Sequence, residues 1–286
     1  CPDRKTGDAK SARNRRKIAP GRVYDLHKIE PRSEKSMNQI DLKDRHAIVT
    51  GGAKGIGQAI AARALASGAR VSIWDIDAAR TEQTIKALDT GGAVRGDTID
   101  VTDPEAIARG LDDAVAAFGK VDILVNNAGS VGTVAPLWEQ PIENWQRMLT
   151  LNLTSTFLCC RAVTPHMLEN GYGRIVNIAS NAGKMATLQN SPYAAAKAGV
   201  ISITKTLAKE TAKSGVLVNA VAPGGANTEL FDGLPAEYAR QIASAMPLDR
   251  LIEPDEIAAL AVWAASEDCS GTTGAVFDIS GGRADY

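Results

Sequence analysis

The sequence has few of the features that mark membrane, disulfide-bonded or metal-binding proteins. No apolar run in its 286 residues approaches the about 20 needed to cross a bilayer, so we expect no membrane partner. The four cysteines form neither a CxxC pair nor a disulfide framework, which fits a reducing, cytoplasmic location. The three histidines, His27, His46 and His166, form no cluster, and we predict no metal site.

Charge is distributed unevenly along the chain. Residues 1–36 hold eleven Lys/Arg and five Asp/Glu, a balance of +6, whereas the remainder holds 21 basic and 28 acidic residues, a balance of −7. The first segment has no amphipathic periodicity and no apolar core of a secretory signal. Its "RNRRK" stretch is compatible with a nucleic-acid or targeting patch. We interpret it instead as a disordered or loosely attached leader, expect no nucleic-acid partner, and predict the folded domain at residues 37–286.

Short aliphatic runs alternate with longer helical patterns from residue 46 onward. This alternation predicts an α/β fold in one domain, with a parallel sheet between two layers of helices. Most of the runs are continuously apolar, as strands covered on both faces should be. The strands are predicted at 46–50, 69–75, 93–100, 121–126, 173–180, 216–223 and 274–280. The helices are predicted at 56–67, 78–90, 104–118, 141–170, 193–213 and 254–266.

A glycine-rich turn, "TGGAKGIG", joins the first predicted strand to the first helix. Glycines at 51, 55 and 57 permit a tight turn and a close approach of backbone to a pyrophosphate. The helix that follows supplies free N–H groups and a partial positive charge. The spacing differs from that of both the general dinucleotide fingerprint and the Walker A loop, and a plain tight turn would look similar.

Asp75 strengthens the dinucleotide interpretation. It ends the second strand, where a carboxylate can hold the ribose hydroxyls of NAD and repel the additional phosphate of NADP. Asp77 is better placed than Asp75 to cap the next helix. Lys54 favours the opposite preference, because a cation in the loop could accept a 2′-phosphate. We expect NAD to be preferred over NADP, with use of both left open.

Four stretches in order link the chain to a known family: this loop, "NNAG" at 126–129, "IAS" ending at Ser180, and "YAAAK" at 193–197. Together they resemble the short-chain dehydrogenase/reductase (SDR) family, in its classical branch, over about residues 40–284. The resemblance implies a single Rossmann domain with a seven-stranded parallel sheet. It also implies a homo-oligomer, usually a tetramer. In that assembly helices 141–170 and 193–213 would pair across a two-fold axis, and residues 277–286 would support a second interface.

The resemblance assigns cofactor contacts along the whole domain. Asp100 and Val101 match the adenine contact, and the segment around Pro223 matches the one that touches the nicotinamide carboxamide. Ala226 replaces the branched residue that usually precedes Thr228 by two, which weakens that last assignment. The implied cofactor residues are Gly51, Lys54, Gly55, Ile56, Gly57, Asp75, Asp100, Val101, Asn127, Ala128, Gly129, Tyr193, Lys197, Pro223, Gly224 and Thr228.

The reacting group implied by the resemblance is Asn152, Ser180, Tyr193 and Lys197. A free phenol has a pKa of about 10 and is a poor base near neutrality. Lys197, one helical turn after Tyr193, would favour the phenolate and bind the nicotinamide ribose. Ser180 would bind the substrate oxygen, and Asn152 would anchor a water that links Lys197 to solvent. Each residue alone also has a plain structural interpretation, as a cap, a packed aromatic or a solvated lysine.

The side chains after Pro223 indicate the substrate class. The segment after Pro223 would form a lid, and its mixture of polar and apolar residues predicts a small, polar pocket. We therefore expect a dehydrogenase of a small secondary alcohol, polyol or sugar acid. One alternative is a 3-oxoacyl-carrier-protein reductase, although Glu169 and Asn170 stand where a basic cluster for an acidic carrier would be expected. Another is a cofactor-binding sensor without catalysis, which the presence of both Tyr193 and Lys197 disfavours.

Overall fold

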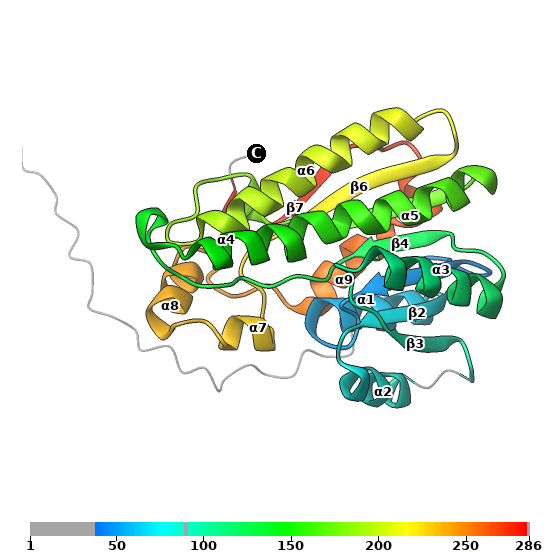
Figure 1. Ribbon diagram of the computed structural model, residues 1–286, viewed down its shortest axis with the longest axis horizontal. Coiled ribbons are helices and arrows are strands. Elements are labelled where there is room, and N and C mark those ends of the chain that lie inside the picture. The colour runs from blue at the N-terminus through cyan, green and yellow to red at the C-terminus, as the bar shows by residue number, and fades with distance from the viewer. Residues whose placement is uncertain (1–37, 89–90, 285–286) are drawn as a thin grey trace, which may run out of the picture. The chain divides into compact units, whose positions relative to one another are not determined.

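Strands and helices alternate through most of the chain (Figure 1). The structure, a computed structural model, describes residues 38–88 and 91–284, so the basic segment 1–36 and the boundary predicted at Met37 lie outside the described residues. The strands are β1 (His46–Thr50), β2 (Arg70–Asp75), β3 (Val94–Thr98), β4 (Ile123–Asn126), β5 (Gly173–Ile178), β6 (Val216–Pro223) and β7 (Val276–Ile279). The helices are α1 (Gly55–Ala66), α2 (Ala78–Ala87), α3 (Pro104–Phe118), α4 (Ile142–Leu149), α5 (Ser155–Glu169), α6 (Ser191–Thr211), α7 (Glu229–Asp232), α8 (Ala236–Ser244) and α9 (Pro254–Ala264).

The seven strands form one parallel sheet in the order β3-β2-β1-β4-β5-β6-β7. The predicted α/β class and seven-stranded Rossmann sheet are confirmed. The chain order reverses between β1 and β4, and the helices that follow these neighbouring strands, α1 and α5, pack on opposite faces of the sheet. Ligands of open α/β sheets bind in the crevice at such a point. The topology therefore directs attention to the segments that follow β1, β4 and β5.

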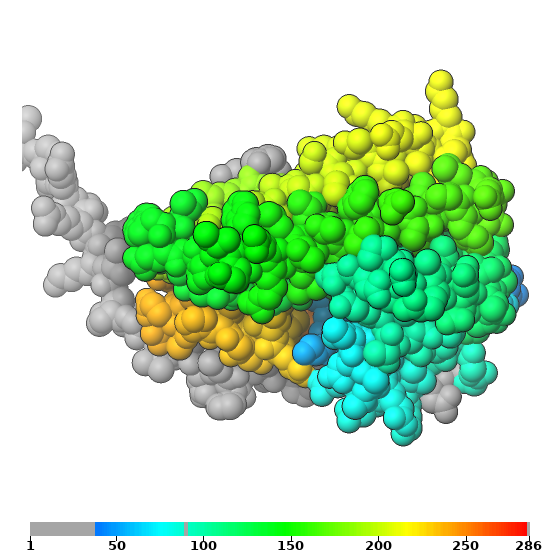
Figure 2. Space-filling model, viewed as in Figure 1, coloured from blue at the N-terminus to red at the C-terminus, as the bar shows by residue number. Residues whose placement is uncertain are grey.

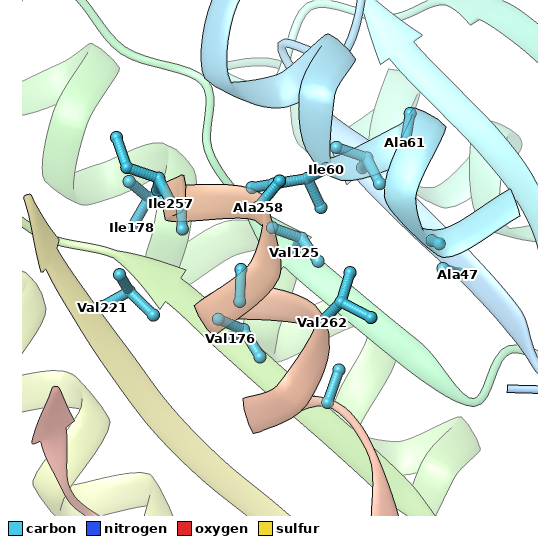
Figure 3. Close-up of a cluster of buried hydrophobic side chains, with 14 of the residues drawn as sticks. Ala47, Ile60, Ala61, Val125, Val176, Ile178, Val221, Ile257, Ala258 and Val262 are labelled. Atoms are coloured by element: carbon cyan, nitrogen blue, oxygen red, sulfur yellow. The ribbon is translucent and has the colours of Figure 1, made fainter. Parts of the chain in front are cut away.

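Successive side chains of each central strand point to opposite faces of the sheet and pack in two different hydrophobic cores. Val49, Val125 and Val176 pack with residues of α1 and α9 on one face of the sheet, a cluster drawn in part in Figure 3. Their neighbours Ile48 and Leu124 pack with residues of α3, α5 and α6 on the other face. This alternation explains the continuously apolar strands, because both faces of the sheet exclude water.

The helix starts follow the capping residues in the sequence. The Asp77 side chain accepts a hydrogen bond from the Arg80 amide at the start of α2, as predicted. Asp103 accepts one from the Glu105 amide at the start of α3, and Pro104 follows it where a missing N–H costs little. Among the described residues no helix is both long and apolar enough to cross a membrane.

The helix predicted over 141–170 is not uniform. The structure divides it into α4, a π-helical turn at Thr150–Thr154, and α5. A π turn holds one residue more than an α turn, and it changes the direction in which the side chains around it point. Asn152 lies inside this turn, so the prediction of one regular helix was wrong at the position of a predicted site residue.

Candidate active site

The loop after β1 is shaped for close approach of a phosphate group. Gly51 and Gly55 have φ angles of 60° and 55°, in the left-handed region that favours glycine. A Cβ on Gly57 would overlap the Gly51 carbonyl oxygen, so only glycine fits there. Lys54 precedes α1 without a side-chain cap, which leaves the first amides of the helix to bind an anion. These features fit the pyrophosphate of a dinucleotide.

Hydrogen bonds between side chains and backbone hold Asp75 and Asn127 at this loop, at the ends of β2 and β4, the two strands that flank β1. The Asp75 carboxylate accepts hydrogen bonds from the amides of Ala53 and Asp77, both at 3.1 Å. The Asn127 side chain donates to the carbonyls of Thr50 and Gly51, both at 3.0 Å. Asp75 and the segment Asn127–Gly129 therefore border the phosphate loop, where the sequence predicts the adenosine half of the cofactor.

Further predicted cofactor residues lie after the carboxyl end of β3 and at the carboxyl end of β6. Asp100 accepts hydrogen bonds from Thr102 in the turn after β3, and the neighbouring Val101 is buried. Thr228 caps α7 by accepting a hydrogen bond from the Phe231 amide at 3.4 Å. A Cβ on Gly55 would lie 3.5 Å from the Thr228 methyl group, so the phosphate loop and the segment after β6 lie against each other. Pro223 ends β6, and Gly224 packs closely on the Ser280 backbone.

Lys197 is a buried cation beside Tyr193. Its side chain lies on α6, is 5% exposed, and donates from Nζ to the Ile178 carbonyl at 2.7 Å. The Nζ atom lies 5.7 Å from the centre of the Tyr193 ring. Burial lowers the pKa of Lys197 to about 8, because a dry environment disfavours the charged form. The interpretation of Lys197 as a solvated surface lysine was therefore wrong.

Two effects act in opposite directions on the pKa of Tyr193. Burial raises the pKa of its phenol, and a hydrogen bond with Ser180 acts in the opposite direction. Ser180 follows β5 and is itself buried, with its hydroxyl accepting the Ala182 amide at 3.1 Å. Ser180 therefore caps the turn, as its plain structural interpretation requires, and still contacts Tyr193.

Asn152 and Lys197 both lie close to Gly129. Its side chain is fully buried, accepts the Ser130 amide at 3.2 Å, and donates to the Ser130 and Met148 carbonyls at 2.9 Å and 3.1 Å. A Cβ on Gly129 would lie 2.5 Å from Asn152 Oδ1 and 3.7 Å from Lys197 Nζ. Glycine at this position thus lets the segment after β4, the π turn and the N-terminal part of α6 lie close together.

The segment after β6 lies over this edge of the sheet. Figure 2 shows the surface hollowed between the orange segment that contains α7 and α8 and the blue and cyan segments of β1 to α2. Tyr238 of α8 is buried and adds to the rise in the pKa of Tyr193. Tyr238 was not predicted as a site residue, although it is one of two aromatic residues, with Phe231, in the predicted lid. Arg80, which contacts the segment after β6 through Glu229, was not predicted either.

Comparison with known proteins shows the family to which the chain belongs. The family model described as short chain dehydrogenase matches residues 45–239. The chain belongs to this family. It is therefore an NAD(P)-dependent oxidoreductase that acts on a small molecule, in agreement with the resemblance drawn from the four sequence stretches.

Several family members align over nearly their whole length. The 2-dehydro-3-deoxy-L-rhamnonate dehydrogenase (NAD(+)) of Sphingomonas sp. is 45% identical over 242 residues, covering 85% of this chain and 96% of that protein. The D-threitol dehydrogenase of Mycolicibacterium smegmatis is 41% identical, with coverages of 84% and 93%. The crystal structure of levodione reductase superposes with a TM-score of 0.81 at 31% identity, covering 84% of this chain and 98% of that one.

Proposed function

We propose that the chain oxidises a secondary alcohol of a small polar substrate, a sugar acid or polyol, with NAD⁺, through Tyr193, Lys197, Ser180 and Asn152. The observation that carries the proposal is the contact of Tyr193 with Ser180 beside the buried Lys197, next to the phosphate loop. Ser180 follows β5, whereas Tyr193 and Lys197 lie one turn apart on α6.

Tyr193 would act as the general base. Its phenolate oxygen would take the proton of the substrate hydroxyl and become a phenol, and a nicotinamide held beside Lys197 would supply the acceptor for the hydride of the same carbon. Burial alone makes the phenol too weak an acid for this role. The Lys197 cation, 5.7 Å from the ring centre, would oppose that effect in the catalytic complex by favouring the phenolate.

Ser180 and Asn152 would support the proton transfer. The Ser180 hydroxyl contacts Tyr193, so it can donate to the same substrate oxygen and stabilise the charge that develops there. Asn152 uses its side chain on the backbone of Ser130 and Met148. It therefore fixes the segment after β4 beside Lys197, where the proposed relay water would be held.

The preference for NAD⁺ rests on Asp75. Its carboxylate lies at the phosphate loop, where it can accept hydrogen bonds from ribose hydroxyls and repel a 2′-phosphate. The proposed substrate class has support from the names of two relatives. One is an NAD⁺-dependent dehydrogenase of a deoxy sugar acid, and the other acts on a four-carbon polyol.

The first test is NADH formation by the full chain at mildly alkaline pH on sugar acids, polyols and 3-hydroxyacyl thioesters. We expect turnover with a sugar acid or polyol, faster with NAD⁺ than with NADP⁺. Tyr193→Phe removes the base and should lower kcat about 10²–10⁴-fold with NADH binding retained. Turnover confined to the thioesters would contradict the substrate class.

A matched control comes from a tyrosine outside the site. Tyr172 stacks under the guanidinium groups of Arg45 and Arg174, at 3.6 Å and 4.4 Å from its ring centre. Tyr172→Phe keeps the ring and should leave kcat within about twofold. Equal losses in the two variants would contradict the role assigned to Tyr193.

A further inference from the structure

One carboxylate of the lid contacts two cations at the cofactor crevice. Glu229 is the first residue of α7, directly after Thr228. Its Oε1 atom forms an ion pair with Arg80, and its Oε2 atom lies 4.0 Å from Lys54 Nζ. The two cations belong to different elements, and each is matched by a different oxygen of the same side chain.

Both cations belong to the rim where Asp75 lies. Lys54 is part of the phosphate loop, and its neighbour Ala53 donates its amide to Asp75. Arg80 lies in the first turn of α2, the helix that follows Asp75. The hydroxyl of Thr84, also on α2, donates to the Ala53 carbonyl at 2.7 Å and so holds this helix against the loop. Lys54, Arg80 and Asp75 therefore surround the same part of the crevice.

We propose that Glu229 selects NAD⁺ against NADP⁺ from the lid, in addition to Asp75. The inference rests on the proposed use of NAD⁺. A 2′-phosphate on the adenosine ribose needs cations, and arginine and lysine are the side chains that bind phosphate. Glu229 pairs with both of these cations and so brings a carboxylate of the segment after β6 to this rim. A 2′-phosphate would have to displace Glu229 and would also be repelled by it.

The solvent exposure of these three side chains indicates that their ion pairs affect ligand binding more than folding. Arg80, Lys54 and Glu229 are 39%, 59% and 58% exposed, and ion pairs of this kind contribute little to folding. A doubly charged ligand can therefore compete for the cations. The structure thus assigns Glu229 an effect on ligand choice, with little effect on stability.

The test uses two probes that differ only in the 2′-phosphate, namely 5′-AMP and adenosine 2′,5′-bisphosphate. Calorimetric titration of the full chain and of Glu229→Gln with each probe, at low ionic strength, gives four dissociation constants. We expect the bisphosphate to bind about five- to tenfold more tightly to the variant, and 5′-AMP to bind within about twofold of the unaltered chain. High salt should reduce the gain, because the contacts are exposed.

Two further variants sharpen the test. Glu237→Gln makes the same change on α8, at a glutamate that pairs with Arg240 of its own helix, and should change neither constant. The double variant Glu229→Gln/Arg80→Gln also lacks the Arg80 cation that the single variant frees from its ion pair. It should lose most of the gain in affinity for the bisphosphate.

The possible outcomes separate this inference from the proposed function. Unchanged binding of the bisphosphate to Glu229→Gln would overturn the inference. Binding of 5′-AMP to the same variant would show that the nucleotide site is intact, so the proposed cofactor would stand. Equal tightening of both probes would also overturn it, because Glu229 would then close the lid without regard to the 2′-phosphate. Failure of the unaltered chain to bind 5′-AMP would contradict the proposed cofactor and overturn the inference with it.

Discussion

Lys197 holds a charge where the surrounding protein excludes water, and this has a consequence for folding. Its pKa is about 8 in the folded chain and about 10.4 in an unfolded one. Between these values the unfolded state binds more protons, so the contribution of Lys197 to the free energy of unfolding rises with pH. The penalty for burying the charged lysine is complete below about pH 8 and disappears as the pH approaches 10.4. The site therefore holds its cation at a cost in stability under neutral conditions.

Lys197→Met should expose this dependence. The free energy of unfolding of the unaltered chain should rise relative to that of the variant between about pH 8 and pH 10, and the difference should be constant below about pH 8. Urea unfolding at several pH values measures it. Lys209→Met, at an exposed lysine of the same helix, is the control for removing a lysine from α6. Parallel stability curves for Lys197→Met would show that the lysine is not desolvated.

At the scale of elements, the π turn between α4 and α5 deserves a test of its own. Asn152 makes three hydrogen bonds to backbone groups from inside this turn. Asn152→Ala removes them and leaves partners without a bond, which should lower the free energy of unfolding by about 2 kcal/mol. Two of these bonds hold the Ser130 backbone, in the segment after β4. The variant's kcat should therefore fall even when it is calculated per folded molecule. Chemical denaturation and turnover measured on one preparation check both expectations.

Asn170→Ala is the matched control for this turn. Asn170 ends α5, is exposed, and donates to the His166 carbonyl at 2.8 Å. Its replacement should cost less than about 1 kcal/mol and leave kcat unchanged. If Asn152→Ala behaved like Asn170→Ala, the turn would have no part in organising the site.

Elements differ in how far the sequence predicts them, for physical reasons. The strands 46–50 and 216–223 were predicted at their observed bounds, because a run buried on both faces ends where its apolar residues end. Asp77 and Asp103 indicated helix starts, because capping is local. The π turn leaves no such trace, since one additional residue barely changes the apolar period. Likewise, the pairing of Glu229 with Arg80 joins residues 149 positions apart, and only the folded chain brings them together.

At the scale of the whole molecule, α4 and α5 present apolar side chains to solvent. Ile142 and Trp145 of α4 and Phe157 of α5 are 70%, 42% and 48% exposed. Single exposed apolar residues are ordinary, but several large ones on consecutive helices are typical of an interface. We propose that this surface pairs with its copy across a two-fold axis, as the predicted homo-oligomer requires, so that the same helices meet from both subunits.

Phe157→Glu should separate the subunits. In a two-fold interface one substitution places two carboxylates near the axis, so both their burial and their mutual repulsion oppose association. Sedimentation equilibrium should give a multiple of the chain mass for the unaltered protein, four under the tetramer prediction, and a smaller one for the variant. Ile76→Glu, at a residue 70% exposed before α2, should leave the mass unchanged. A monomeric mass for the unaltered chain would contradict the proposed interface. An unchanged mass for Phe157→Glu would assign the assembly to another surface, with residues 277–286 as the next to test.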